Sequence, residues 1–258
     1  MDLSLLLTIM HKQFLVYLCL FSVYSFGQGK PVVYQQQAWV AFNPQIKLSK
    51  HWGLWFDSEV HTNDHYFNGY SQMVFRLAGT YYNKKQNKFT AGYGFSDYFP
   101  GDNHKYISQP EHFAWQQYQW YKYPGKSKMM QWVRLEQKFR EDVVDNYTLA
   151  GTYTLTYKVR YNFYWAIPLS KRGLKANTLA AAIGNELYLY YAPHLPNHVF
   201  DQERVFLGFS YAVNSHDNLV FGVMNMFQED VAGTQFKDNN VLRVSFFQNI
   251  GMKTHHVD

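Results

Sequence analysis

Residues 153–165 alternate between apolar and polar side chains at every second position. The odd positions are aromatic or aliphatic throughout, whereas the even positions are polar and include Lys158 and Arg160. Successive side chains of a β-strand point to opposite faces, so this segment predicts a strand with one apolar face and one polar face. It is longer than the five or six residues of a usual globular strand, and it suffices to cross a bilayer at a tilt, which takes roughly 9–11 residues.

The same alternation recurs along the chain, with turn residues between the segments. The predicted strands are residues 35–48, 52–60, 70–82, 89–99, 112–123, 129–139, 153–165, 179–190, 204–213, 219–227 and 241–247. The fifth segment is aromatic on both faces, so its pattern does not fix which side chains point inward. Bacterial barrels normally have an even number of strands, so we expect about twelve strands, with ten as the second choice. The missing strand would lie in residues 28–44, unless the N-terminal segment threads the lumen.

Short and long connections alternate between these strands, and charge follows the same division. Lysine and arginine gather in the short turns, at Lys50, Lys84, Lys85, Lys88, Lys126, Lys128, Lys171, Arg172 and Lys175. Acidic residues gather in the long loops, at Asp64, Asp102, Glu141, Asp142, Asp145, Asp201, Glu229, Asp230 and Asp238. Outer-membrane barrels have short periplasmic turns and longer outer loops, so the pattern predicts an all-β, transmembrane, up-and-down antiparallel β-barrel. Basic turns suit anionic lipid headgroups, although hydrophilic turns can also recruit lysine for solubility alone.

Composition excludes two other classes of protein. Aromatic residues make up 19% of the 258 residues, with 22 Tyr and 21 Phe, yet the mean hydropathy is only −0.38. After residue 27 there is no apolar run of about 18 residues, which a helical membrane protein needs. The net charge is +5, but the basic residues are dispersed among turns rather than gathered in the contiguous patch of a nucleic-acid binder.

The N-terminus predicts a secretory signal peptide over residues 1–27, with Met10 as an alternative start. A basic Lys12 precedes the apolar run at residues 14–26, and Gly27 offers a small residue for cleavage. A membrane-anchor helix is the alternative, but the run is short for one. Residues 28–258 then form one outer-membrane barrel domain in a Gram-negative bacterium. Cys19, the one cysteine, lies in the signal, so we expect neither a disulfide nor thiol chemistry in the mature chain.

An ordered set of residues along these strands resembles a known family. The set is Trp39, Trp52 to Glu59, Gln72, Arg76, Gly92-Tyr93, Glu111, Trp115-Gln116-Gln117, Arg134, Glu136-Gln137, Arg160-Tyr161, Asn185-Glu186, Phe200 to Arg204 and Gly208. It resembles a bacterial outer-membrane barrel family catalogued as domain of unknown function 2490, over essentially the whole mature chain. The resemblance implies the barrel and its location, and it brings no established activity. Lys138 and Glu203 depart from it, standing where Arg and Asn are expected, and the chain runs past Phe247, where barrel proteins often end.

Seven charged residues fall on the predicted inner face of the barrel: Glu59, Arg76, Arg134, Glu136, Arg160, Glu186 and Arg204. Glycines 92, 94, 184 and 208 share that face and leave space for long side chains. Buried charges must be paired, so one interpretation is a Glu/Arg network that fills and braces the lumen. The function would then be structural, an interaction or narrow transport. The alternative is a selectivity surface, which would make the protein an anion-preferring porin for small solutes.

A lipid-active hydrolase or acyltransferase is the third possibility, and the residues argue against it. Such an enzyme needs a serine and a histidine within hydrogen-bond reach, but Ser58 has lipid-facing parity and His61 the opposite parity. Two histidine pairs, His61 with His65 and His194 with His198, are interpreted as solvated loop residues rather than metal ligands. We therefore expect no catalytic residue, cofactor or metal. The expected partners are outer-membrane lipid, lipopolysaccharide and the barrel-assembly machinery, and not nucleic acid.

Overall fold

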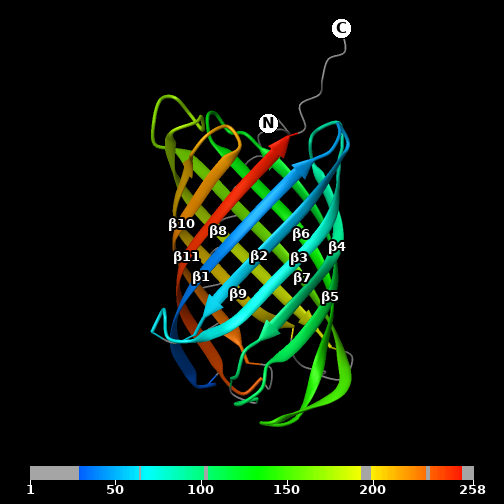
Figure 1. Ribbon diagram of the computed structural model, residues 1–258. Helices are drawn as coiled ribbons and strands as arrows, with labels where there is room; N and C mark the ends of the chain where they lie inside the picture. Colours follow the sequence, from blue (N-terminus) through cyan, green and yellow to red (C-terminus); the bar gives the residue numbers. More distant parts are fainter. Residues whose placement is uncertain (1–28, 64, 102–103, 193–198, 231–232, 252–258) are drawn as a thin grey trace, which may run out of the picture. The chain divides into compact units, whose positions relative to one another are not determined.

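The structure is a computed structural model, in which residues 29–63, 65–101, 104–192, 199–230 and 233–251 are described (Figure 1). The chain divides into two units, residues 1–31 and 32–258, and the second is a closed β-barrel. The predicted signal peptide, Cys19 and the histidines at 194 and 198 lie outside the described residues. No helix among the described residues has the length and apolar character to cross a bilayer.

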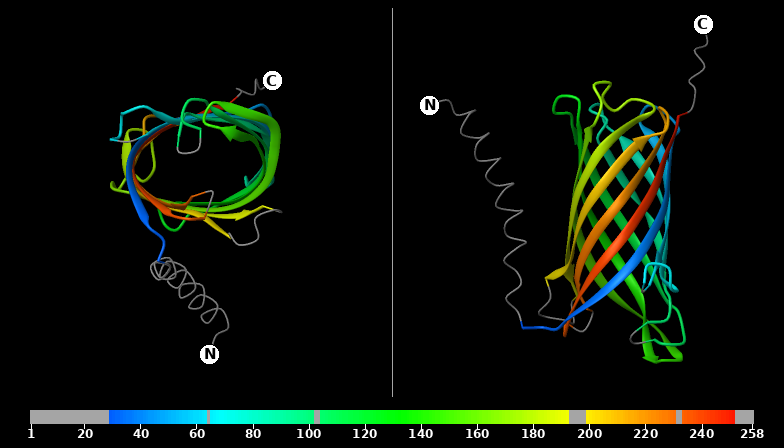
Figure 2. Two further views of the ribbon diagram at one scale, coloured as in Figure 1. Left: turned by 90° about the horizontal axis from the view of Figure 1, so that it is seen from below. Right: turned by 90° about the vertical axis from the view of Figure 1, so that its left-hand side faces the viewer.

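Eleven strands form the barrel in the described part of the chain, and they lie side by side in chain order. They are β1 (Val32–Lys47), β2 (Trp52–Thr62), β3 (Tyr70–Tyr82), β4 (Lys88–Tyr98), β5 (Gln109–Lys122), β6 (Lys128–Asp145), β7 (Thr148–Pro168), β8 (Thr178–Tyr191), β9 (Phe200–Ala212), β10 (Asp217–Glu229) and β11 (Phe236–Gly251). Consecutive strands pair antiparallel. Figure 2 shows the barrel along its axis, with an oval section.

The expectation of twelve strands, or ten, is wrong, because the barrel closes with a parallel pair. β1 and β11 run in the same direction and pair from Val32↔Phe236 to Lys47↔Gly251. A parallel closing pair lets an odd number of strands complete the cylinder, and the described residues 29–44 hold no second strand beside β1. Residues 32–47 form one strand that continues through Pro44, where the ladder to β2 is interrupted between Phe42↔Ser58 and Gln45↔Trp55. Proline has no N–H for such a ladder.

The predicted inward and outward positions are confirmed wherever the alternation fixed them. In β3, Val74, Arg76, Ala78 and Thr80 are buried, whereas Phe75 and Leu77 are exposed. The fifth segment, left open by its sequence, points Phe113 and Trp115 inward. Two buried apolar clusters lie inside the barrel, one around Met224 and Phe206 and the other around Trp55 and Trp115.

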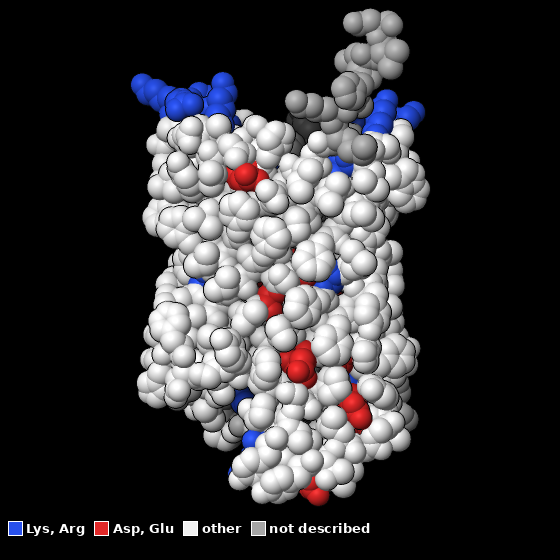
Figure 3. All heavy atoms as spheres, in the orientation of Figure 1, with Lys and Arg blue, Asp and Glu red and all other residues white. Residues whose placement is uncertain are grey.

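The connections also separate into two ends, with one correction. Residues 48–51, 83–87, 123–127, 169–177 and 213–216 make the short turns at one end, which we call the short-turn end. Lys and Arg side chains gather at this end (Figure 3). At the other end, residues 140–147 are not a loop, because β6 and β7 continue as a hairpin whose tip is residues 146–147. The register of this hairpin shifts at two places between Glu141 and Asp145. These irregularities interrupt the alternation of apolar and polar residues, which is why the sequence pattern ended the strand at residue 139.

Glycine is required where β9 and β10 approach most closely. Gly208 pairs with Gly222, and a Cβ on Gly208 would lie 2.2 Å from the Phe221 carbonyl oxygen and 2.8 Å from Gly222 Cα. Gly94 has a related role, because the Phe113 ring occupies the space that a side chain at position 94 would need. A Cβ on Gly94 would lie 2.1 Å from Cζ of Phe113. These two positions explain why glycines share the inward face.

Gly208→Ala is expected to lower the free energy of unfolding by about 1–3 kcal/mol, the usual cost of overpacking a filled interior. Gly79→Ala is the matched control, because a Cβ there would meet no atom within 4 Å. Urea unfolding of the refolded proteins measures both. Equal stability of the two variants would contradict the close approach of β9 and β10.

Candidate functional site in the barrel lumen

A buried carboxylate on β6, Glu136, lies at the centre of the inward-facing charges. The Arg160 Nη1 donates to Glu136 Oε1 at 2.6 Å, and Arg134 Nη1 lies 3.6 Å from the same oxygen. The Lys138 Nζ lies 3.9 Å from Oε2. Glu136 is 2% exposed, so its negative charge is compensated by these cations rather than by water.

Arg160 extends this group of charges toward β8 and β9. Its Nε and Nη2 donate to Glu186 Oε1 at 2.9 and 2.6 Å. The other oxygen of Glu186 lies 3.8 Å from Arg204 Nη1. One guanidinium therefore joins two carboxylates from different strands, a use that suits the planar fork of arginine.

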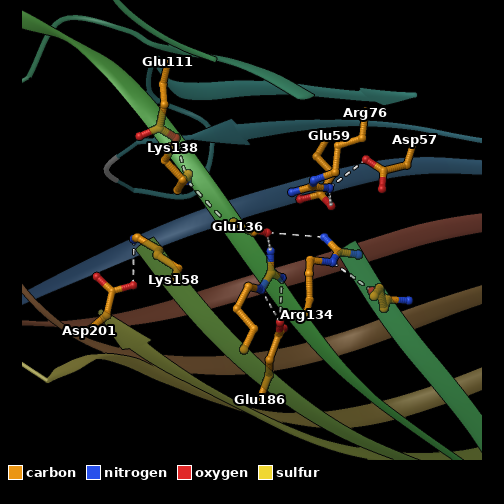
Figure 4. A network of polar contacts seen from close by, with 12 residues as sticks. Asp57, Glu59, Arg76, Glu111, Arg134, Glu136, Lys138, Lys158, Glu186 and Asp201 are labelled. Atoms are coloured by element: carbon orange, nitrogen blue, oxygen red, sulfur yellow. Dashed lines mark hydrogen bonds and ion pairs between the residues drawn. The ribbon is translucent and has the colours of Figure 1, made fainter. Parts of the chain in front are cut away.

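A second group lies on β2 and β3 (Figure 4). The Arg76 Nη1 donates to Asp57 Oδ1 at 2.7 Å and to Glu59 Oε1 at 2.9 Å. The Nε2 of His61 lies 3.2 Å from Glu59 Oε2. Asp57 is almost fully buried, so Arg76 is its direct compensating charge.

The third group reaches toward the long-loop end of the barrel. Glu111 on β5 accepts from Lys138 Nζ at 2.6 Å and from Arg140 Nε at 2.8 Å. Lys158 and Asp201 pair at 2.8 Å across β7 and β9. Because Lys138 contacts both Glu111 and Glu136, it joins this group to the central one. We call the three groups together the lumen charge network.

All seven residues predicted for the lumen take part in this network. The structure brings Arg134, Glu136, Arg160, Glu186 and Arg204 into the central group and Glu59 with Arg76 into the second. The predicted set omitted Asp57, Glu111, Lys138, Arg140, Lys158 and Asp201. The alternation along β2 and β6 predicted that Asp57 and Lys138 point inward, on the same face as Glu59 and Glu136. The direction of the Glu111 side chain could not be predicted, because the aromatic pattern of β5 did not show which of its faces points inward.

Aromatic rings cover the guanidinium groups of the network. Arg134 lies 4.3 Å from the centroid of Trp115, 4.9 Å from that of Trp132 and 5.7 Å from that of Trp55. Such contacts favour a cation over the electron-rich face of a ring. Trp55 belongs to β2 and Arg134 to β6, so this contact joins strands that are not neighbours in the barrel wall.

A similar bridge lies toward the closing strands. Arg204 of β9 lies 4.7 Å from the Trp39 ring of β1 and 4.5 Å from the Tyr188 ring. The Trp39 ring stacks on His61 at 3.8 Å. Side chains from separated strands therefore meet inside the barrel. Trp115 is 0% exposed and Glu111 1% exposed, so neighbouring side chains cover both residues inside the barrel.

The prediction that His61 is a solvated loop histidine is wrong. It belongs to β2, is 5% exposed and is held between Trp39 and Glu59. Ser58 pairs with the exposed Phe42 on the outer wall. The serine and the histidine that an acyl-transfer enzyme would need thus lie on opposite faces of the barrel wall.

The family described as "Protein of unknown function (DUF2490)" matches residues 36–237. The chain belongs to this family. The match extends from β1 into β11 and includes every residue of the lumen charge network. The searched curated proteins and solved structures give no match to the chain. The family resemblance expected from the sequence is confirmed, and the family name assigns no activity.

Glu136→Gln is expected to destabilise the protein by about 3–5 kcal/mol, because it leaves buried cations without their shared carboxylate. Asp142→Asn is the matched control. Asp142 is in the exposed hairpin, and its two oxygens accept from the Thr152 and Thr154 hydroxyls; in asparagine the amide oxygen can accept from one hydroxyl and the amide nitrogen can donate to the other. Its effect should stay within about 0.5 kcal/mol. Chemical unfolding measures both, and a Glu136→Gln variant as stable as the control would refute the central role of Glu136.

Proposed function

We propose that this protein is an integral outer-membrane β-barrel of a Gram-negative bacterium, delivered by its signal peptide and closed to solutes by its lumen charge network. Its role is structural, or it presents a surface for interaction at the membrane, and it is not an enzyme. The observation that carries the proposal is an inverted distribution of side chains. Charged residues are buried inside the barrel, while large apolar residues cover its outside.

The outward-facing apolar residues support the proposal that the barrel wall is surrounded by lipid. Ten of the eleven strands, all but β5, contribute large exposed apolar residues to this surface, and examples are Val40, Leu54, Leu77, Tyr93, Leu135, Val159, Ile183, Leu207, Val223 and Leu242. Leu77 is 59% exposed and Val223 55%. A soluble monomer rarely exposes a continuous apolar surface of this extent, whereas a transmembrane barrel needs an apolar outer band.

Aromatic side chains near the short-turn end support the same placement. Trp52, Tyr81 and Phe89 are exposed on neighbouring strands just below the basic turns. Outer-membrane barrels carry such aromatic girdles at the membrane interface. In this proposal the short turns are periplasmic, the lipid partners include lipopolysaccharide on the outer side, and the barrel-assembly machinery inserts the chain.

The long-loop end favours an interaction role over transport. The β6–β7 hairpin exposes Val144 and Tyr147, and Tyr147 stacks on the exposed Tyr106 at 4.5 Å. Backbone hydrogen bonds join the two segments, since the Tyr106 N–H donates to Asn146 O at 3.1 Å. A paired aromatic surface held away from the wall suits contact with another molecule. The filled lumen, by contrast, leaves the porin alternative without a supporting observation.

Leu77→Arg tests the membrane placement directly. An arginine on the lipid face near the bilayer midplane should lower the free energy of unfolding by about 2–4 kcal/mol in lipid vesicles. Val144→Arg is the control, because Val144 is equally exposed but lies in the hairpin beyond the wall, and it should change stability little. If both variants match the wild type in vesicles, the outer wall does not face lipid.

The closed lumen should make the barrel electrically silent. Refolded protein, verified as folded by its heat-modifiable gel mobility, is expected to show no stable unitary currents in planar bilayers. Large currents would overturn this part of the proposal. If such currents preferred anions and lost that preference in Arg160→Gln, the porin interpretation would replace it.

A further inference from the structure

Three lysines face the lumen at its short-turn end. Lys47 ends β1, while Lys88 and Lys128 begin β4 and β6. The sequence placed Lys88 and Lys128 in turns, but the structure makes them strand residues with the inward parity of Thr90 and Trp132. We call them the inner-rim lysines. They are half-buried, unlike the exposed turn lysines such as Lys50 and Lys84.

The inner-rim lysines converge on two tyrosine rings. The Nζ atoms of Lys47 and Lys88 lie 4.9 and 5.7 Å from the centroid of Tyr82. The Nζ atoms of Lys88 and Lys128 lie 5.9 and 4.7 Å from the centroid of Tyr121. Each neighbouring pair of ammonium groups therefore shares one ring, and Lys88 belongs to both pairs. Each of the three ammonium groups thus lies within 5.7 Å of the centroid of a tyrosine ring.

Among the described residues, no carboxylate lies within ion-pair distance of these three ammonium groups. Their hydrogen bonds go to neutral amides, from Lys47 Nζ to Gln86 Oε1 at 3.0 Å and from Lys88 Nζ to Gln45 Oε1 at 2.5 Å. Deeper in the lumen the lysines are treated differently, because Lys138 and Lys158 each contact a carboxylate within 2.8 Å. The inner rim is thus a group of like charges that the chain itself does not compensate.

We propose that the inner-rim lysines bind a phosphate group that enters from the short-turn end. Half-buried ammonium groups that share a ring in neighbouring pairs repel one another, and an anion placed between them removes that cost. A multiply charged tetrahedral anion suits three separate point charges, since lysine binds phosphate as a point charge. The planar carboxylates of the lumen are bound mainly by arginine forks instead. The proposal depends on the barrel and its inner face, and not on its location in a membrane.

The phosphate could belong to a soluble ion or to the headgroup of a lipid at the barrel rim, and the recognition chemistry is the same. The amide oxygens of Gln45 and Gln86 accept from Lys88 Nζ and Lys47 Nζ, so both amides lie beside the ammonium groups without adding charge. Tyr82 and Tyr121 hold the lysine side chains in place without adding negative charge. The site therefore selects for charge and size at the rim rather than for the remainder of the ligand.

Binding of inorganic phosphate to the refolded full chain tests the proposal, by calorimetry at a constant ionic strength of about 0.15 M. The triple variant Lys47→Gln/Lys88→Gln/Lys128→Gln should bind at least about tenfold more weakly, which corresponds to about 1.4 kcal/mol. The control Lys50→Gln/Lys84→Gln/Lys126→Gln removes the same net charge from the exposed turns and should bind within about twofold of the wild type.

Phosphate should also raise the unfolding temperature of the wild type and the control, and not that of the inner-rim variant. If the triple variant does not fold, the single variant Lys88→Gln serves, with binding weakened at least about threefold. The proposal is overturned if the wild type does not bind phosphate, or if both triple variants lose affinity equally. The second result would assign binding to net charge alone.

A lipid arm separates the two sources of phosphate. The wild type is placed in phosphatidylcholine nanodiscs with and without phosphatidic acid, and free phosphate is titrated. Competition from phosphatidic acid that disappears in the inner-rim variant assigns the site to a lipid headgroup. Unchanged binding of free phosphate by the wild type in both discs assigns the site to a soluble anion.

Discussion

The barrel depends on the compensation of charge inside its lumen, and Glu136 is where that compensation converges. Its carboxylate lies within 4 Å of cations from β6 and β7, and Arg160 carries the connection onward to Glu186 on β8. A buried charge without a partner is far more costly than a buried pair. The inward charges are therefore stable only as a set, and that set fixes the relative positions of the strands that carry it.

Filling the lumen required more than ion pairs. The guanidinium groups lie against Trp115, Trp132, Tyr188 and Trp39, so large rings occupy the space that the charges leave. Glycine at position 94 makes room for Phe113. Charge, ring and missing side chain are thus complementary features of one interior, which an outward apolar wall encloses.

The alternation of side chains made much of this architecture predictable, because a two-residue period assigns each side chain to a face from local sequence alone. The parity of Arg76, Glu136 and Arg160 followed in this way. The parallel pairing of β1 with β11 did not, since it joins ends of the chain that no local pattern relates. The orientation of β5 stayed open for another reason, because this strand carries aromatic rings on both faces. In the structure Phe113 takes the space left by Gly94, and Trp115 lies against Arg134.

Arginine and lysine meet carboxylates in different ways along the inner face. Arg160 uses three donor nitrogens to join two carboxylates, whereas Arg76 joins two through Nη1 and Lys138 reaches two with one ammonium group. Lys47, Lys88 and Lys128 stand at the rim, where no carboxylate of the described chain is in reach and each ammonium group contacts a ring and remains partly solvated. A closed centre and an open, cationic rim are therefore two results of the same inward-facing pattern. The centre satisfies its charges internally, and the rim leaves its charges to be satisfied from outside.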